Sequence, residues 1–313
     1  MSTIGTPDTN EPPLSHRPGW DYTYHLLLIR GATPQILLVR DEEGWALPRF
    51  RPTEHDLRAV AHIERAVRQS LGLETRVLRC LSVDRSQAQA KRVETVFVLE
   101  VLTDAPPFGA DLRWAEATNL EKIPMTSPAQ RGLVAQWLHP SDGVSQATTN
   151  YPWVLPGWQV EAVAWVGEQL GRHGGGPIAA IGQVRTWALS CVLHIDTPQG
   201  AYYLKALPPA YRPEVAVTNF LAAHFPECIP QVIAADLARG WLLLADVGPL
   251  MENDRLDLWE RIVIQIAAMQ RAAIPAVAPL LALGCADQRL DALAAQAGGA
   301  ADQPAYPRRP PRR

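Results

Sequence analysis

The chain has 313 residues, and its 47% hydrophobic and 19% charged content is enough for about two packed domains. Its 29 Lys and Arg residues nearly balance 32 Asp and Glu residues, which disfavours general polyanion binding and a nucleic acid or membrane surface as partner. The longest uncharged apolar stretch, 272–286, contains two prolines and is shorter than the roughly 18 residues of a membrane-spanning helix. We therefore expect no transmembrane segment.

Both ends of the chain are expected to be disordered. Residues 1–18 are polar and proline-rich and lack the apolar run of a secretory signal, so a cytoplasmic location is expected. Residues 298–313 are rich in Gly, Ala, Pro and Arg and cannot build a core. The cysteines have neither the spacing of a disulfide framework nor that of a zinc site, which predicts reduced thiols at Cys80, Cys191, Cys228 and Cys285.

The first block, 19–139, has the pattern of an α+β domain. Its predicted elements are strands at 22–30 and 35–40, a helix at 53–71, strands at 77–84 and 93–102, and a helix at 127–138. The two first strands flank the turn signal Gly31-Ala-Thr-Pro34 and predict a hairpin. Thr53 stands before the predicted first helical turn, and Gly72 follows the last apolar residue as a C-terminal signal.

A polar segment, 140–152, has the composition of a linker and separates a second block, 153–297. The predicted elements of this block are a helix at 158–170, strands at 178–184, 186–195 and 201–207, a helix at 213–225, strands at 229–236 and 240–247, and a helix at 258–272. The sequence therefore predicts two α+β domains in one chain.

A hairpin, then Trp45-Ala-Leu-Pro48, then a helix closing on Leu71-Gly-Leu73 resembles the Nudix family. The resemblance implies an α/β/α sandwich whose helix carries glutamates that hold magnesium against a pyrophosphate. When Gly72-Leu73 is aligned with the closing pair of the family box, Arg65 and Val67 also match. An unrelated α+β domain with a coincidental Trp-x-Leu-Pro is the alternative interpretation.

The carboxylates of the box are absent from the aligned positions. Magnesium prefers oxygen ligands, usually carboxylates. Those positions hold Leu57, Ala66, Gln69 and Ser70, and the opening glycine is replaced by Arg51. Glu64 is one residue early and would point about 100 degrees away from the site face of the helix. We expect a Nudix-like fold without Nudix hydrolysis.

Lys205, in the second block, is unusual because lysine is rare in this chain. The chain has 26 arginines and only three lysines, so an ammonium between Leu204 and Ala206 on a predicted third strand indicates a site that needs a compact point charge. In protein-kinase-type folds, a lysine on the third strand binds the phosphates of ATP and is held by a glutamate on the next helix. Glu214 in the first turn of that helix fits this role. The alternatives are a solvated lysine and a glutamate that complements the helix dipole.

The surrounding sequence resembles the aminoglycoside and choline phosphotransferases, a branch of the kinase-like superfamily. The resembling segments are Gln183-Val-Arg-Thr-Trp-Ala-Leu-Ser-Cys-Val192, Tyr203-Leu-Lys205-Ala, Ile229-Pro-Gln-Val-Ile-Ala-Ala-Asp236 and Trp241-Leu-Leu-Leu-Ala-Asp-Val-Gly248. The resemblance implies a kinase-like amino-terminal lobe, an antiparallel sheet plus a helix, followed by the first helices of an incomplete larger lobe. It also implies that the turn 183–190 covers the phosphates with Ser190 as a donor, and that Asp246 belongs to the hinge at the adenine. No Gly-x-Gly-x-x-Gly is present in this turn.

Phosphoryl transfer in this superfamily needs a catalytic-loop aspartate, usually after a histidine, and further residues that hold magnesium. All eight histidines precede the predicted hinge, and no aspartate after Asp246 has this context. We therefore expect no catalytic residue and no metal ligand, weak or vestigial ATP binding, and magnesium only if a further lobe were present. The abrupt change of composition near residue 298 indicates a truncated gene or a change of reading frame.

Three functions follow from these expectations. The first is a relative of small-molecule phosphotransferases, fused to a Nudix-like module and catalytically incompetent. The second is a non-catalytic module that binds a nucleotide, or a protein partner through the face that the absent lobe would cover. The third is a metal-dependent hydrolase of the Nudix type that uses carboxylates outside the box.

Overall fold

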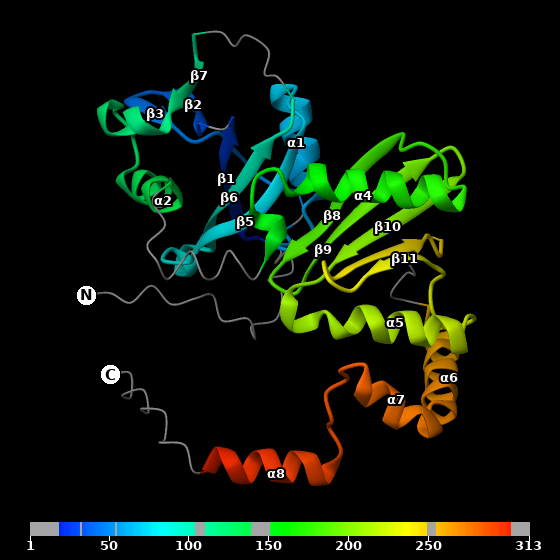
Figure 1. Cartoon of the computed structure of the whole chain (residues 1–313). Helices are drawn as coiled ribbons and strands as arrows, with labels where there is room; N and C mark the ends of the chain where they lie inside the picture. Colours follow the sequence, from blue (N-terminus) through cyan, green and yellow to red (C-terminus); the bar gives the residue numbers. More distant parts are fainter. Residues whose placement is uncertain are drawn as a thin grey trace. The chain divides into compact units, whose positions relative to one another are not determined.

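The computed structural model describes residues 19–31, 33–53, 55–103, 110–138, 151–248 and 255–301. The predicted disorder of 1–18, nearly all of the predicted linker and the tail beyond Ala301 lie outside these residues. The predicted fold class is confirmed, because the chain is α+β with two separate sheets (Figure 1). It forms two compact units: unit 1 joins residues up to Arg212 with Val232–Val247, and unit 2 joins Pro213–Gln231 with the chain from Gly248 onward.

The first part of unit 1 holds a seven-stranded sheet. Its elements are β1 (Asp21–Arg30), β2 (Gln35–Asp41), β3 (Gly44–Ala46), β4 (Arg49–Phe50), α1 (Ala61–Leu71), β5 (Thr75–Asp84), η1 (Ala88–Ala90), β6 (Arg92–Val101), β7 (Leu112–Glu116), η2 (Ala117–Lys122) and α2 (Pro128–Leu138). The strand order is β3-β2-β1-β6-β5, with β4 paired to β1 and β7 to β2. β1 and β6 run parallel, and the other pairs are antiparallel, including the predicted β1–β2 hairpin.

Helices cover both faces of this sheet. Successive residues of a strand point to opposite faces, so Leu26 and Leu28 pack with α1, whereas Leu27 and Ile29 lie in the core that α2 covers through Val134. Because both faces of the central strand β1 are buried, its sequence contains a continuous apolar run, which does not alternate with polar residues. The result is the α/β/α sandwich that the sequence predicts.

The second part of unit 1 holds a five-stranded antiparallel sheet in the order β11-β12-β10-β9-β8. Its elements are η3 (Pro152–Val154), α4 (Trp158–His173), β8 (Ala180–Trp187), β9 (Ser190–Thr197), β10 (Gly200–Ala206), η4 (Pro209–Tyr211), β11 (Val232–Asp236) and β12 (Trp241–Ala245). α4 packs Ala162, Val166 and Leu170 on the sheet, in one core with Leu204 and Leu243 (Figure 1). The apolar spacing that predicts the helix thus marks its buried face.

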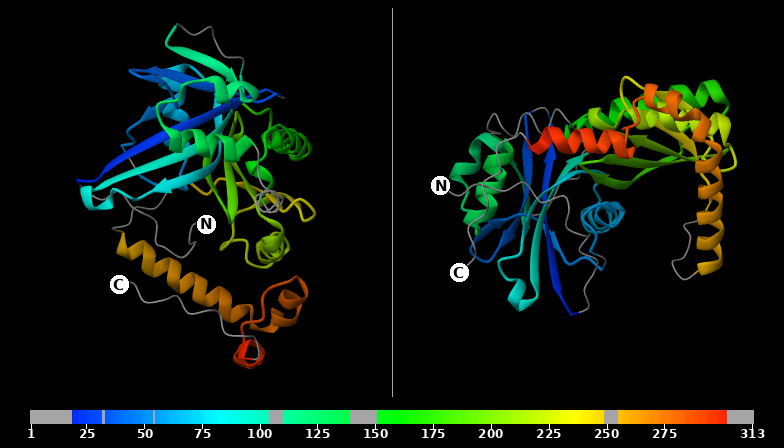
Figure 2. Two further views of the ribbon diagram at one scale, coloured as in Figure 1. Left: turned by 90° about the vertical axis from the view of Figure 1, so that its left-hand side faces the viewer. Right: turned by 90° about the horizontal axis from the view of Figure 1, so that it is seen from below.

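Unit 2 consists of helices: α5 (Pro213–His224), α6 (Leu256–Ala272), η5 (Ile274–Ala276), α7 (Val277–Ala282) and α8 (Leu290–Ala301). Within the described chain, no single helix is long and apolar enough to cross a membrane, but α6 and Ile274–Ala282 pass that test together with a bend of 52° between them (Figure 2). α6 has no buried residue, and Val263 and Ile264 are each more than 60% exposed. α8 continues to Ala301, so the first residues of the predicted tail are helical.

The helix predicted at 53–71 is wrong in its first half. α1 begins at Ala61, because the preceding segment forms backbone hydrogen bonds with β8: the Thr186 N–H donates to the Arg58 carbonyl over 3.0 Å, and the Val60 N–H to the Val184 carbonyl over 3.3 Å. Asp56 accepts the Arg58 N–H and holds the turn before this segment. A contact to a strand more than 120 positions away cannot be read from the local pattern. The predicted end is right, since Gly72 caps α1 at φ 66°.

The strand predicted at 186–195 is also displaced. β8 extends to Trp187 and β9 begins at Ser190, so that only two residues, Ala188 and Leu189, turn the chain between them. The segment 183–190, predicted as a turn that covers phosphates, is therefore mostly strand.

Candidate functional site

The face of α1 on which the Nudix resemblance places metal ligands carries no carboxylate. Gln69 and Ser70 are exposed, and the Ser70 hydroxyl donates to the Ala66 carbonyl over 2.7 Å, a bond within the helix. In the part of the chain that the structure describes, no group of three or more His, Cys, Asp and Glu could hold a metal ion. A magnesium-dependent step has no ligand set on this face.

Glu64 lies on another side of α1, toward β8. It is 9% exposed, and its Oε2 accepts the Gln183 N–H over 3.3 Å. Burial raises the pKa of the Glu64 carboxyl to about 8, although hydrogen bonds and the charges of Arg68 and Arg76 oppose this effect. The carboxyl is therefore mostly neutral at pH 7.

Gln183 joins the two sheets through its side chain. Its Oε1 accepts the Val77 N–H and its Nε2 donates to the Val77 carbonyl, both over 2.9 Å, so that the amide pairs with β5 as a neighbouring strand would. Gln183 is 3% exposed. Nothing in the sequence near Gln183 identifies its partner, which is 106 residues earlier in the chain.

A second contact ties the start of α4 to the first sheet. The Arg76 side chain is fully buried, and its Nη2 donates to Glu100 Oε2 over 2.7 Å and to the Leu155 carbonyl over 3.0 Å. The other oxygen of Glu100 accepts the Gly157 N–H over 2.8 Å. The Arg76 guanidinium also lies 5.5 Å from the ring centre of Trp158. We call these contacts the buried junction: Glu64 and Val77 with Gln183 of β8, and Arg76 and Glu100 with the chain just before α4.

The predicted ATP lysine, Lys205, lies in the middle of β10, opposite Val192 of β9 and Leu242 of β12, and is half-buried. Glu214 is in the first turn of α5 as predicted. Lys205 belongs to unit 1 and Glu214 to unit 2, so their pairing stays a prediction.

The other two predicted nucleotide-binding residues flank the same sheet. Ser190 is buried at the start of β9, and its Oγ accepts the Trp187 indole N–H over 3.0 Å. Asp246 is exposed directly after β12, and its N–H donates to the Ala201 carbonyl. Partial burial and then the charge of Asp246 raise the pKa of Tyr203. The roles of Ser190 and Asp246 toward a nucleotide stay predictions.

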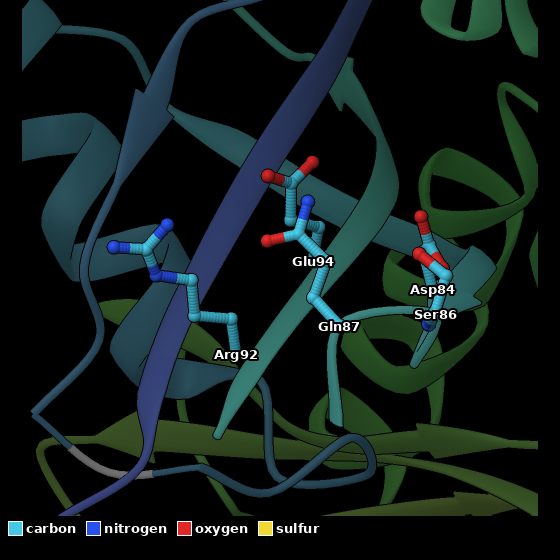
Figure 3. Close-up of a pocket in the computed structure, with 5 residues that line it drawn as sticks. All are labelled: Asp84, Ser86, Gln87, Arg92 and Glu94. Atoms are coloured by element: carbon cyan, nitrogen blue, oxygen red, sulfur yellow. Dashed lines mark hydrogen bonds between the residues drawn. The ribbon is translucent and has the colours of Figure 1, made fainter. Parts of the chain in front are cut away.

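A shallow polar pocket lies at the β5–β6 hairpin. It is lined by Asp84, Ser86, Gln87, Arg92 and Glu94 and has a volume of about 40 Å³. Figure 3 shows Glu94 and Gln87 at its centre, with Asp84 and Arg92 on opposite sides. A volume of this size holds a water molecule or two and excludes a nucleotide.

Next to this pocket, His25 is buried, with a hydrogen bond at one ring nitrogen and the Glu94 carboxylate near the other. Its Nε2 lies 3.3 Å from Glu94 Oε2, and its Nδ1 lies 2.9 Å from Gln130 Nε2. Because Gln130 Oε1 accepts the Leu47 N–H, its amide nitrogen faces His25 as a donor. Burial lowers the pKa of His25, and the carboxylate of Glu94 opposes this. This arrangement stabilises the neutral ring with its proton on Nε2.

No protein-family model matches the chain, and no curated protein matches it. Several solved structures similar to part of it are Nudix proteins. A UDP-X diphosphatase is 22% identical, with a TM-score of 0.30, over 39% of this chain and 64% of that chain, so the match spans less than two thirds of that protein.

Two further Nudix structures are similar to about the same share of the chain. A Nudix hydrolase from M. smegmatis is 20% identical over 42% of this chain and 87% of its own, with a TM-score of 0.29. The Nudix domain of a Shewanella oneidensis protein, solved with ADP-ribose, is 14% identical over 38% of this chain and 89% of its own, with a TM-score of 0.29.

Proposed function

We propose that this chain is a non-catalytic relative of small-molecule phosphotransferases that binds a nucleotide weakly through its five-stranded sheet. The observation that carries the proposal is the position of Lys205. It is half-buried on the third strand of an antiparallel sheet, and the next helix, α5, has Glu214 in its first turn. This is the order of parts with which kinase-type folds hold ATP phosphates.

The proposal assigns nucleotide binding to the described residues and no phosphoryl transfer. Transfer needs a catalytic base at the acceptor hydroxyl and a metal held between carboxylates and phosphates. No histidine follows His224 in the sequence, so it contains no His-x-Asp segment after β12. The chain is expected to bind a nucleotide and leave it unchanged.

Nucleotide titration of the ¹⁵N-labelled chain tests this function. We expect ATP to shift amide signals of β9, β10 and β12 with a dissociation constant near 1 mM, about −4 kcal/mol. Lys205→Met should abolish the shifts, because it removes the charge that meets the phosphates and leaves an apolar side chain of similar length. Lys122→Met, at an exposed lysine, is the matched control and should bind as the wild type does. Equal binding by the Lys205→Met variant would contradict the proposal, and so would micromolar affinity.

A Nudix-like binding module in the first domain is the second candidate function. It is supported by the α/β/α sandwich around β1 and β6 and by the position of Gly72 at the end of α1. Because positions 66, 69 and 70 hold Ala, Gln and Ser, we expect no magnesium-dependent release of phosphate or nucleoside monophosphate from a panel of nucleoside diphosphate derivatives. Turnover in this panel would favour the hydrolase alternative instead.

A further inference from the structure

Glu64 lies inside the contact between the two sheets of unit 1. It projects from α1, and Gln183 of β8 provides its hydrogen bond through a backbone N–H at 3.3 Å. The Gln183 side chain has no further donor for the carboxyl, because its Oε1 accepts the Val77 N–H and its Nε2 donates to the Val77 carbonyl and to Cys191 Sγ. The backbone bonds from Val60 to Val184 and from Thr186 to Arg58 lie beside it along β8.

No ionisable group described near Glu64 pairs with it, because each nearby arginine is paired with another glutamate. Arg76 on β5 is bonded to Glu100 at 2.7 Å, and Arg68 on α1 is bonded to Glu74 at 2.6 Å on the surface. Cys191 on β9 is a neutral thiol, because burial raises its pKa to about 11. Among the described residues, no lysine or arginine forms an ion pair with Glu64.

A carboxylate in this position would be buried with only neutral backbone N–H groups, those of Gln183 and Val77, as donors. Such a charge costs several kcal/mol, and the group instead keeps its proton. The neutral acid fits the same space and accepts the same hydrogen bond. Opening of the junction admits water and lets the acid ionise at its ordinary pKa.

We propose that Glu64 makes the buried junction a pH-sensitive switch: the neutral acid keeps α1 and β5 packed on β8, and opening of this contact becomes more favourable as the pH rises. The proposal goes beyond nucleotide binding and depends on no property of the Lys205 site. It assigns a conformational role to the one carboxyl of α1 that faces the second sheet.

The direction of the effect follows from proton linkage. An exposed glutamate titrates near pH 4.3, whereas burial raises the pKa of Glu64 to about 8 in the closed state. Between these values the closed state holds one proton more than the open state. The opening equilibrium constant therefore rises about tenfold per pH unit from about pH 5 to about pH 8 and then levels off. The stabilisation is complete below pH 4 and is lost as the pH approaches 8.

The first test measures the titration of Glu64 directly. Carboxyl ¹³C signals of the intact chain are followed from pH 4 to pH 10, and the Glu64 signal is identified by its absence in Glu64→Gln. A midpoint between 7 and 9 supports the proposal. A midpoint between 4 and 5 would overturn it.

The second test measures opening of the junction by amide hydrogen exchange at pH 5.5 and pH 7.5, corrected for intrinsic rates. In the wild type, protection of the amides of Gln183, Val77 and Thr186 should fall about a hundredfold between the two pH values. Glu64→Gln keeps the shape and the acceptor but cannot ionise, so its protection should change less than threefold. Glu168→Gln, at an exposed glutamate of α4, is the control and should behave as the wild type does.

An equal fall in the wild type and in Glu64→Gln would overturn the proposal, and so would unchanged protection in the wild type. If Glu64→Gln does not fold, the carboxyl signals of the wild type, assigned through backbone correlations, decide by themselves.

Discussion

Arg68 and Arg76 each form an ion pair with a glutamate, but one pair is exposed and the other is buried. Arg68 and Glu74 form an ion pair in which both side chains are about half exposed, whereas Arg76 is fully buried against Glu100. Water and salt screen an exposed pair, so it contributes little to stability. A buried pair differs, because removal of one partner leaves the other charge without solvent or counterion.

Arg76→Ala is therefore expected to lower the free energy of unfolding by about 3–5 kcal/mol, because Glu100 and the Leu155 carbonyl lose their donor. Arg68→Ala, the matched control on the exposed pair, should cost under about 1 kcal/mol. Urea unfolding followed by tryptophan fluorescence and circular dichroism measures both values. Equal losses for the two variants would contradict the burial of Arg76.

At the level of an element, the role of a glycine in a turn also depends on the atoms around it. Gly72 and Gly240 both adopt the left-handed conformation, with φ of 66° and 75°. A Cβ on Gly72 would meet no atom within 4 Å, whereas a Cβ on Gly240 would lie 2.7 Å from the backbone carbonyl of Leu207. Gly240 therefore serves two needs: it turns the chain between β11 and β12, and it admits the strand end at Leu207.

Gly72→Ala is expected to cost about 1 kcal/mol through backbone conformation alone. Gly240→Ala should cost at least about 2 kcal/mol more. The added methyl group would push the Leu207 carbonyl away, and this movement would break the hydrogen bond from the Leu207 N–H to the Gly240 carbonyl. Thermal unfolding of the two variants gives the comparison. If Gly240→Ala were no less stable than Gly72→Ala, the close approach of Gly240 to the Leu207 carbonyl would be wrong.

At the scale of the molecule, the buried junction makes the two sheets of unit 1 depend on each other. α1 and β5 of the first domain contact β8 of the second through Glu64, Val77 and Gln183, and the Arg76–Glu100 pair holds the chain just before α4. Buried polar groups of this kind are stable only while every partner is in place. Both sheets accordingly belong to one compact unit.

Gln183→Ala is expected to lower the free energy of unfolding by about 2–4 kcal/mol, since it leaves the N–H and the carbonyl of Val77 buried without partners. Both sheets should lose stability together, so amides of Leu28 in β1 and Leu204 in β10 should show the same fall in exchange protection. Gln199→Ala, at an exposed glutamine, should change stability by less than about 0.5 kcal/mol. A loss confined to one sheet would show that the domains unfold independently.

The sequence by itself determined the elements whose signals are local. Short apolar runs on either side of a turn signal located β1 and β2, helical spacing located α4 and α5, and Gly72 marked the end of α1, because each signal involves residues a few positions apart.

Only the tertiary structure decided where α1 begins and what Glu64 and Gln183 do. Residues 55–60 fit a helical pattern, yet they form bonds with β8 because unpaired backbone groups of that strand edge need partners. Gln183 lies in a segment that resembles a phosphate-covering turn, but its amide pairs with Val77 across 106 positions. Contacts of such sequence separation depend on how two sheets pack, and no periodicity or motif within either segment records that packing.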